Sequence, residues 1–185
     1  RLAPAAAKPA LDGAGAQLAM LERRHGGRLG VAILDTGNGR REGCRDDERF
    51  LMCSTFKLLL AAAVLQKVDS GTERLDRRIV FGKDVLLDYA PTTKQHVGPP
   101  GMTVSELCEA AIILSDNTAA NLLLKEIGGP QAVTAYARSL GDESTLLDRY
   151  EPTLNPYDMT TPNAMLGDMQ QLLLGDRLSR SSRDL

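Results

Sequence analysis

An apolar run from Leu58 to Leu65, placed directly after Ser54-Thr55-Phe56-Lys57, most constrains the fold of this chain. Leu, Ala and Lys are strong helix formers, so the run predicts a helix that begins near Ser54 and ends near Asp69. The predicted helix is apolar around most of its circumference. We therefore expect it to be buried on all sides and not to be an amphipathic surface helix.

A hydroxyl and a lysine stand one turn apart at the start of this helix. Positions i and i+3 share a helical face and lie about 4.5 Å apart along the axis, so the Lys57 amine can reach the Ser54 hydroxyl. The helix N-terminus offers its partial positive charge to a developing anion at the same place. These features indicate an activated serine nucleophile. The alternative is structural, with Ser54 capping the helix and the Lys57 ammonium extending to water.

Composition excludes several classes of function. The 185-residue chain is 43% hydrophobic, which is enough for one sizeable core or two small subdomains. A net charge of −2 gives no reason to expect a nucleic acid or a membrane surface as a partner, and no apolar stretch is long enough to span a membrane. The three cysteines and two histidines form no metal-ligand pattern, so we expect no metal site.

Helical segments dominate the rest of the chain. We expect a first helix over residues 12–24 and then a hairpin, with strands over residues 28–36 and 40–45 joined by a turn at Gly37-Asn38-Gly39. Residues 71–101 are rich in proline and glycine and predict a long irregular connection. Further helices are predicted from a capping box at Thr103 to Leu114, over residues 118–127 and 131–140, and from Thr161-Pro162 to about Leu174.

Only the hairpin supplies convincing strands. A lone hairpin is marginally stable in water, so we expect it to belong to a larger sheet whose other strands this chain lacks. The predicted organisation has three parts. Residues 1–50 form the N-terminal helix and hairpin of an α/β domain, residues 51–174 form a mainly helical domain, and residues 175–185 begin a truncated helix.

Two later segments carry groups suited to catalysis. Ser115-Asp116-Asn117 lies at a break between helices, where a second serine hydroxyl can relay a proton and the Asn117 amide can hold a polar substrate group. Alternatively, Ser115 or Asp116 simply caps the next helix. In the other segment, Glu151 precedes a proline and can share a bound water with Asn155. The alternative here is a solvated surface carboxylate.

Taken together, the three segments resemble one known family. Ser-x-x-Lys at Ser54, Ser-Asp-Asn at Ser115 and Glu-x-x-x-Asn at Glu151 occur in the order and approximate separation found in class A serine β-lactamases. The resemblance extends over nearly the whole chain. It includes Phe50-Leu51-Met52-Cys53, Tyr89-Ala90-Pro91, Gly101-Met102-Thr103-Val104, Asp116-Asn117-Thr118-Ala119-Ala120-Asn121 and Thr160-Thr161-Pro162.

The resemblance implies an α/β fold in which a helical domain stands beside an antiparallel sheet packed with helices. It also implies that Ser54 attacks the β-lactam carbonyl and forms an acyl-enzyme. Lys57 takes part in proton transfer from Ser54, directly or through a water shared with Glu151, and the choice of acylation base stays open. Ser115 passes a proton to the departing lactam nitrogen.

Further roles follow from the same resemblance. Asn117 binds the acylamide side chain of the substrate, and Tyr89 forms one wall of the cleft. Glu151 and Asn155 position and activate the water that hydrolyses the acyl-enzyme, whereas Asp116 holds the turn.

The resemblance also bears on partners and location. No metal or organic cofactor is needed, and the substrates are penicillins and cephalosporins. We expect a monomer, with a complementing C-terminal fragment as a possible second chain. Residues 1–10 lack the apolar segment of a signal peptide, which indicates a mature N-terminus and a periplasmic or secreted protein that confers antibiotic resistance.

The chain departs from the family pattern in two places. The family carries a Lys-Thr-Gly or similar triplet on a strand that lines the cleft, and this sequence has no such triplet. The loop after Glu151 is several residues shorter than expected, because only Pro156 and Tyr157 separate Asn155 from Asp158. A shortened loop should leave Ser54 able to acylate but misplace the deacylation water, so that the acyl-enzyme accumulates.

Two rival functions use related chemistry. A penicillin-binding DD-peptidase shares Ser-x-x-Lys and a similar Ser-x-Asn, but the Glu151 segment argues against it. A non-catalytic β-lactam sensor or binding domain acylates without turnover, which the short loop would permit. Replacement of Glu151 separates these functions from a hydrolase.

We predict that the 185-residue chain alone is inactive, because the missing triplet region would supply the second oxyanion donor and three more strands. Loss of one oxyanion donor alone typically costs about 10²–10³ in turnover. The measurement is nitrocefin hydrolysis by the purified chain with no second fragment present. Measurable hydrolysis would refute this expectation.

Overall fold

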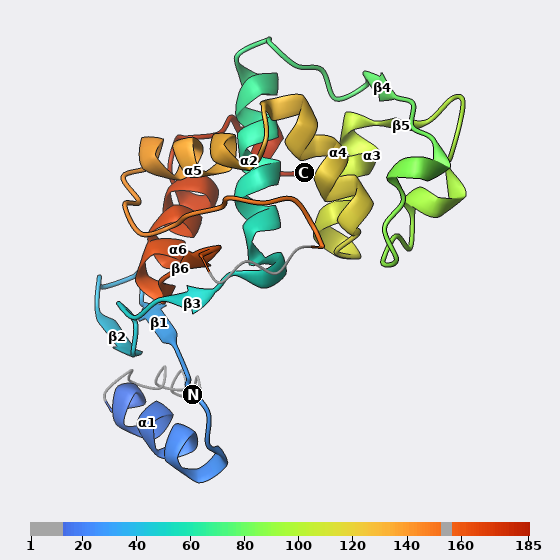
Figure 1. Cartoon of the computed structure of the whole chain (residues 1–185). Coiled ribbons are helices and arrows are strands. Elements are labelled where there is room, and N and C mark those ends of the chain that lie inside the picture. The colour runs from blue at the N-terminus through green and yellow to red at the C-terminus, as the bar shows by residue number, and fades with distance from the viewer. Residues whose placement is uncertain (1–12, 153–156) are drawn as a thin grey trace, which may run out of the picture.

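The computed structural model of the chain describes residues 13–152 and 157–185. Its central element is helix α2 (Phe56–Asp69), which is buried along most of its length and confirms the predicted buried helix. Helices α3 (Val104–Ile113), α4 (Asn117–Ile127) and α5 (Pro130–Ser139) pack against it, with α5 on one side and α3 and α4 on the other (Figure 1). The core consists mainly of aliphatic side chains from these four helices.

Helices α3 and α6 (Pro162–Met169) begin at threonines whose side chains cap free N–H groups. At α3 the predicted capping box is present: the Glu106 N–H donates to Thr103 Oγ1 (3.1 Å), and the Thr103 N–H donates to the Glu106 carboxylate (2.7 Å). Helix α6 has the predicted Thr161 cap and continues into a π-helical turn, Gln170–Leu174. A short last helix, α7 (Arg180–Arg183), packs on α2.

The N-terminal part contains α1 (Ala14–His25) and the predicted hairpin. Strand β1 (Val31–Leu34) pairs antiparallel with β2 (Arg41–Cys44), and α1 packs on β2. The predicted helix cap at Asp12 lies outside the described residues. Glu22 of α1 accepts from the Arg45 guanidinium through both carboxylate oxygens, at 2.7 and 2.9 Å. This bidentate ion pair joins α1 to the residue that follows β2.

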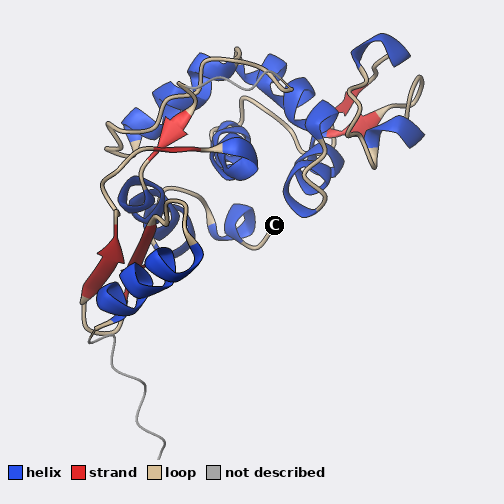
Figure 2. Cartoon of the chain, turned by 60° about the horizontal axis from the view of Figure 1, so that its bottom comes forward, coloured by secondary structure: helices blue, strands red, loops and turns tan. Residues whose placement is uncertain are grey.

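The prediction that only the hairpin supplies strands is wrong. Strand β3 (Phe50–Leu51) pairs with β6 (Met159–Thr160), and β4 (Arg78–Ile79) pairs with β5 (Met102–Thr103). Each of these strands has two residues, which is too short to show the alternation that identifies a strand in a sequence. The hairpin and the β4–β5 pair lie at opposite ends of the structure (Figure 2).

The β3–β6 pairing has the greater consequence for function. The Met52 N–H also donates to the Asp158 carbonyl (3.0 Å), which extends the contact to the residue just before the 3-10 turn that contains Ser54. The segment that follows Glu151 therefore returns to the start of α2. Among the described residues, no helix is long and apolar enough to cross a membrane.

Candidate active site

The Lys57 side chain lies at the meeting point of three segments. It belongs to the first turn of α2 and is only 3% exposed. Its Nζ lies within hydrogen-bond distance of four oxygens: Ser54 Oγ (3.1 Å), the Ser115 carbonyl (2.8 Å), Ser115 Oγ (3.0 Å) and Asn117 Oδ1 (2.6 Å). Glu151 Oε1 is 3.9 Å from the same nitrogen. The structure thus brings together the four residues predicted to be catalytic, and Asn117 with them.

Ser54 is exposed and does not cap the helix. It lies in a 3-10 turn (Cys53–Thr55) that precedes α2, and α2 has no side-chain N-cap hydrogen bond. Cys53 has a left-handed backbone (φ 45°), a strained conformation for a residue with a side chain. At this bend the chain passes from buried Met52 to exposed Ser54. The structural alternative, with a capping serine and a lysine extended to water, is therefore wrong.

Ser115 and Asn117 are held by the residue between them. Asp116 is fully buried, caps α4 by accepting from the Ala119 N–H, and accepts from the main-chain N–H groups of Thr92 and Thr93. Ser115, with φ of 54°, is in the left-handed region at this break between helices. Asp116 thus fixes the turn that directs its two neighbours toward Lys57.

Tyr89 lies beside this turn. The Asn117 N–H donates to the Tyr89 carbonyl (3.1 Å), and 55% of Tyr89 is exposed. The main chain of Tyr89 is thus anchored next to Asn117, and its large side chain is exposed. Asn155, the remaining predicted substrate-binding residue, lies outside the described residues.

The Glu151 backbone is held from α4. Asn121 Oδ1 accepts from the Glu151 N–H (3.0 Å), and Asn121 Nδ2 donates to the Glu151 carbonyl (2.8 Å). The Glu151 side chain is 18% exposed, so it is not the solvated surface carboxylate of the alternative interpretation. Sequence reasoning assigned no role to Asn121. The available signal was its position four residues after Asn117, which puts both amides on one face of the helix.

The surroundings of Lys57 favour its neutral form more than water does. Burial lowers the pKa of Lys57 below its ordinary 10.5, although the negative charges of Glu151 and Asp116 act to raise it. The Ser115 carbonyl and Asn117 Oδ1 can only accept hydrogen bonds. A neutral amine satisfies both with its two N–H groups and retains a lone pair, which can take the proton of Ser54. The site can therefore generate a serine alkoxide at a helix N-terminus.

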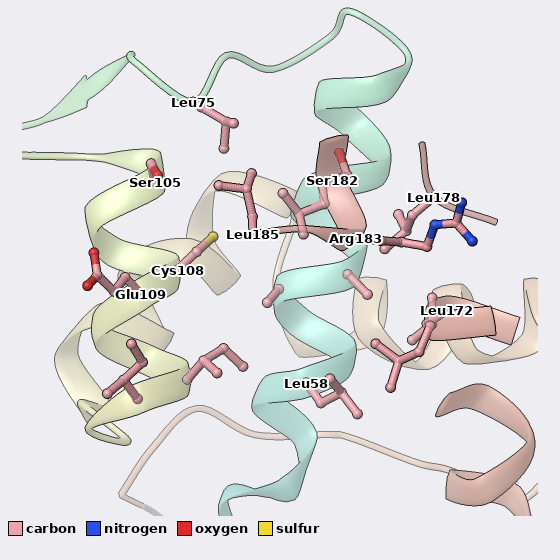
Figure 3. A pocket seen from close by; sticks show the side chains of 16 residues that line it. Leu58, Leu75, Ser105, Cys108, Glu109, Leu172, Leu178, Ser182, Arg183 and Leu185 are labelled. Carbon is pink, nitrogen blue, oxygen red and sulfur yellow. The ribbon is translucent and has the colours of Figure 1, made fainter. Parts of the chain in front are cut away.

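An apolar pocket of about 300 Å³ lies between α2, α3 and the C-terminal segment and contains none of the predicted site residues (Figure 3). Within residues 13–152 and 157–185, no group of three or more His, Cys, Asp or Glu side chains is placed to hold a metal ion.

A serine in the turn before a helix and a buried lysine in the first turn of that helix, with a second serine, an amide and a carboxylate around them, form a candidate site for serine acyl transfer. Residues 14–185 match the Beta-lactamase enzyme family, and the chain belongs to that family. It is 50% identical over 176 residues to β-lactamase L2 from Stenotrophomonas maltophilia, an alignment that covers 92% of this chain. The chain spans 58% of the length of that relative.

Solved structures agree with this assignment. An ancestral class A β-lactamase, of the last common ancestor of Gram-negative bacteria, is 64% identical with a TM-score of 0.89. A putative class A β-lactamase, PenP from Rhodopseudomonas palustris, is 55% identical with the same TM-score. Each comparison covers 92% of this chain and 67% of the solved chain. The predicted family and fold are confirmed.

We predict that Glu151→Gln lowers the pKa of Lys57 further. The substitution removes a negative charge 3.9 Å from Nζ that stabilises the ammonium, while burial still disfavours it. NMR titration of the Lys57 side chain measures both values, and the wild-type midpoint should lie below 10.5. Glu143→Gln, at a carboxylate that is 82% exposed, is the matched control and should change nothing. A Lys57 midpoint that rises in Glu151→Gln would contradict the electrostatic account.

Proposed function

We propose that this chain carries the acylating and deacylating residues of a β-lactam hydrolase, an enzyme of antibiotic resistance. The observation that carries the proposal is the contact of one buried amine, Lys57, with Ser54, Ser115 and Asn117, and its 3.9 Å approach to Glu151. Penicillins and cephalosporins are the proposed substrates. Membership of the family and 64% identity to a class A enzyme support the assignment.

Acylation begins with attack of Ser54 Oγ on the β-lactam carbonyl carbon. The serine proton passes to Lys57, or through a water to Glu151, and both routes suit a lysine that contacts the hydroxyl at 3.1 Å. The Ser54 N–H, at the N-terminal end of α2, serves as one donor to the oxyanion. When the carbon–nitrogen bond of the lactam breaks, Ser115 Oγ delivers a proton to the nitrogen, and Lys57 restores it across 3.0 Å.

Substrate orientation falls to Asn117 and Tyr89. Because Asn117 Oδ1 accepts from Lys57, the amide orientation is fixed and its Nδ2 group is left to donate to the acylamide carbonyl of the substrate. Tyr89, anchored to Asn117 through its carbonyl, closes one side of the cleft.

Deacylation is the role of Glu151, with Asn155 as the proposed second ligand of the attacking water. The carboxylate removes a proton from this water as the water adds to the ester carbonyl, and Ser54 leaves with a proton returned to its oxygen. The position of Glu151 favours a hydrolase over the DD-peptidase and sensor alternatives. Those functions need the acylating groups but no carboxylate beside Lys57.

Location and assembly are part of the same proposal. The resemblance to class A β-lactamases leads us to place this protein in the periplasm or outside the cell. We propose that it acts as a monomer that a C-terminal fragment can complement.

The test uses a fusion of this chain to the C-terminal region of β-lactamase L2, in which Glu151 is replaced by Ala. Deacylation should slow by about 10²–10⁴, the usual contribution of a general base. Intact-mass spectrometry after a penicillin pulse should show a long-lived adduct on Glu151→Ala. Glu143→Ala is the matched control and should release its adduct as the parent does.

Two outcomes would contradict parts of this account. An adduct lifetime that is unchanged in Glu151→Ala would show that Glu151 does not activate water and would favour a DD-peptidase or a sensor. A parent protein that turns over rapidly with no detectable adduct would contradict the expectation that the short loop after Glu151 slows deacylation.

A further inference from the structure

Two aspartates form a buried pair away from the candidate active site. Asp142 follows α5 and is 7% exposed, and Asp168 belongs to α6 and is 1% exposed. A hydrogen bond between their carboxyl groups contributes to the pKa of each, so the two side chains lie next to each other. The Oδ2 atom of each is buried and meets no N–H or O–H donor. Buried carboxylate oxygens are nearly always paired, so this contact requires an explanation.

A shared proton supplies that explanation. Two ionised carboxylates have no donor between them, so a hydrogen bond between carboxyl groups needs a proton on one of them. Asp142 is the ionised partner, because its Oδ1 accepts from the N–H groups of Ser144 (2.7 Å) and Thr145 (3.0 Å). Burial alone would raise the pKa of Asp142, but a hydrogen bond from the Thr145 side chain, the two N–H bonds and the one from Asp168 hold it below 3.8.

Asp168 has the opposite environment. Burial, the neighbouring Asp142 charge and the hydrogen bond to Asp142 raise the pKa of Asp168 to about 8, although the charge of Arg138 acts to lower it. The Arg138 guanidinium is engaged elsewhere, with the Asp142 carbonyl and with Glu143 at 3.4 Å. The Tyr136 hydroxyl, also buried and without a partner, faces the Asp168 charge from α5. The charge of Arg177 acts to lower the pKa of Tyr136, and the charge of Asp69 acts to raise it.

The pair stands at the base of the segment that carries Glu151. Asp142 begins this segment, and Asp168 lies on the helix that follows it. Between them, Thr145 Oγ1 contacts Thr160 Oγ1 at 2.6 Å, and Leu146 forms a β-bridge with Met159. The two arms of the segment are therefore joined first by the aspartates and then by the Thr145 and Leu146 contacts.

We propose that Asp142 and Asp168 share one proton and that this carboxyl pair fastens the two arms of the Glu151-bearing segment in a pH-sensitive way. The two carboxyl groups stay hydrogen-bonded to each other while the proton is present. Loss of the proton places two negative charges in contact in a buried site, so the arms separate more readily. This proposal concerns folding and does not rest on the proposed activity.

The direction of the pH dependence follows from proton binding. In the unfolded chain Asp168 loses its proton near pH 3.8, whereas in the folded chain it keeps the proton to about pH 8. Between these limits the folded state binds one proton more, so stability falls as pH rises. The unfolding equilibrium constant should increase by up to about tenfold per pH unit, or about 1.4 kcal/mol. Above about pH 8 this contribution is lost and the dependence ends.

The experiment compares urea unfolding of the 185-residue chain and of Asp168→Asn from pH 5 to pH 9. The asparagine amide can donate to Asp142 at every pH, so the variant should lack the pH dependence assigned to the pair. Relative to Asp168→Asn, the wild-type unfolding constant should rise by about tenfold per unit up to pH 8. Asp176→Asn, at an exposed aspartate near α6, is the matched control and should keep the wild-type slope.

A second measurement needs no variant. Carbon-13 NMR of labelled aspartate carboxyl groups in the wild-type chain should show one carboxyl that stays protonated above pH 6, and amide exchange at Leu146 should lose protection as that group titrates. If Asp168→Asn does not fold, the same comparison is made with Asp142→Asn, whose side-chain amide can donate to the Asp168 carboxylate. The proposal is overturned if every aspartate ionises below pH 5, or if wild type and Asp168→Asn share one pH profile.

Discussion

Burial of the Lys57 ammonium is the constraint on which the rest of the site depends. An amine that is 3% exposed loses its hydration, and without partners this costs several kcal/mol. Its partners come from distant parts of the sequence: Ser115 and Asn117 at the break between α3 and α4, and Glu151 in the segment after α5. The helical core and the site are therefore a single arrangement, because the helices meet where the amine must be satisfied.

Polar residues around this centre hold the groups that touch it. Asp116 fixes the turn of Ser115 and Asn117 through buried hydrogen bonds to Thr92 and Thr93, and its charge also acts to raise the pKa of Lys57. Asn121 grips the main chain of Glu151 on both sides. The turn and the Glu151 segment thus depend on α4, and a change in that helix should alter proton transfer without touching a reacting atom.

Much of this arrangement follows from local sequence pattern. The Ser54–Lys57 contact is an i, i+3 relation, and the burial of α2 follows from its apolar circumference. The family resemblance then assigned Ser115, Asn117 and Glu151 to the same site. The left-handed Cys53, at the start of the turn that follows β3, has no signal in composition or periodicity. Two-residue strands such as β3 and β6 are too short to show an alternation of buried and exposed residues. The pairing of Asp142 with Asp168 depends on how α6 packs, which no local pattern encodes.

The central claim is that Lys57 activates Ser54 for acylation. Peptide-mapping mass spectrometry of this chain joined to the C-terminal region of β-lactamase L2, quenched at intervals after penicillin addition, tests it directly. The account predicts an adduct on the Ser54 peptide that forms about 10²–10⁴ more slowly in Lys57→Met and at the parent rate in the exposed control Lys125→Met. An adduct on another residue, or an equal rate in Lys57→Met, would contradict it.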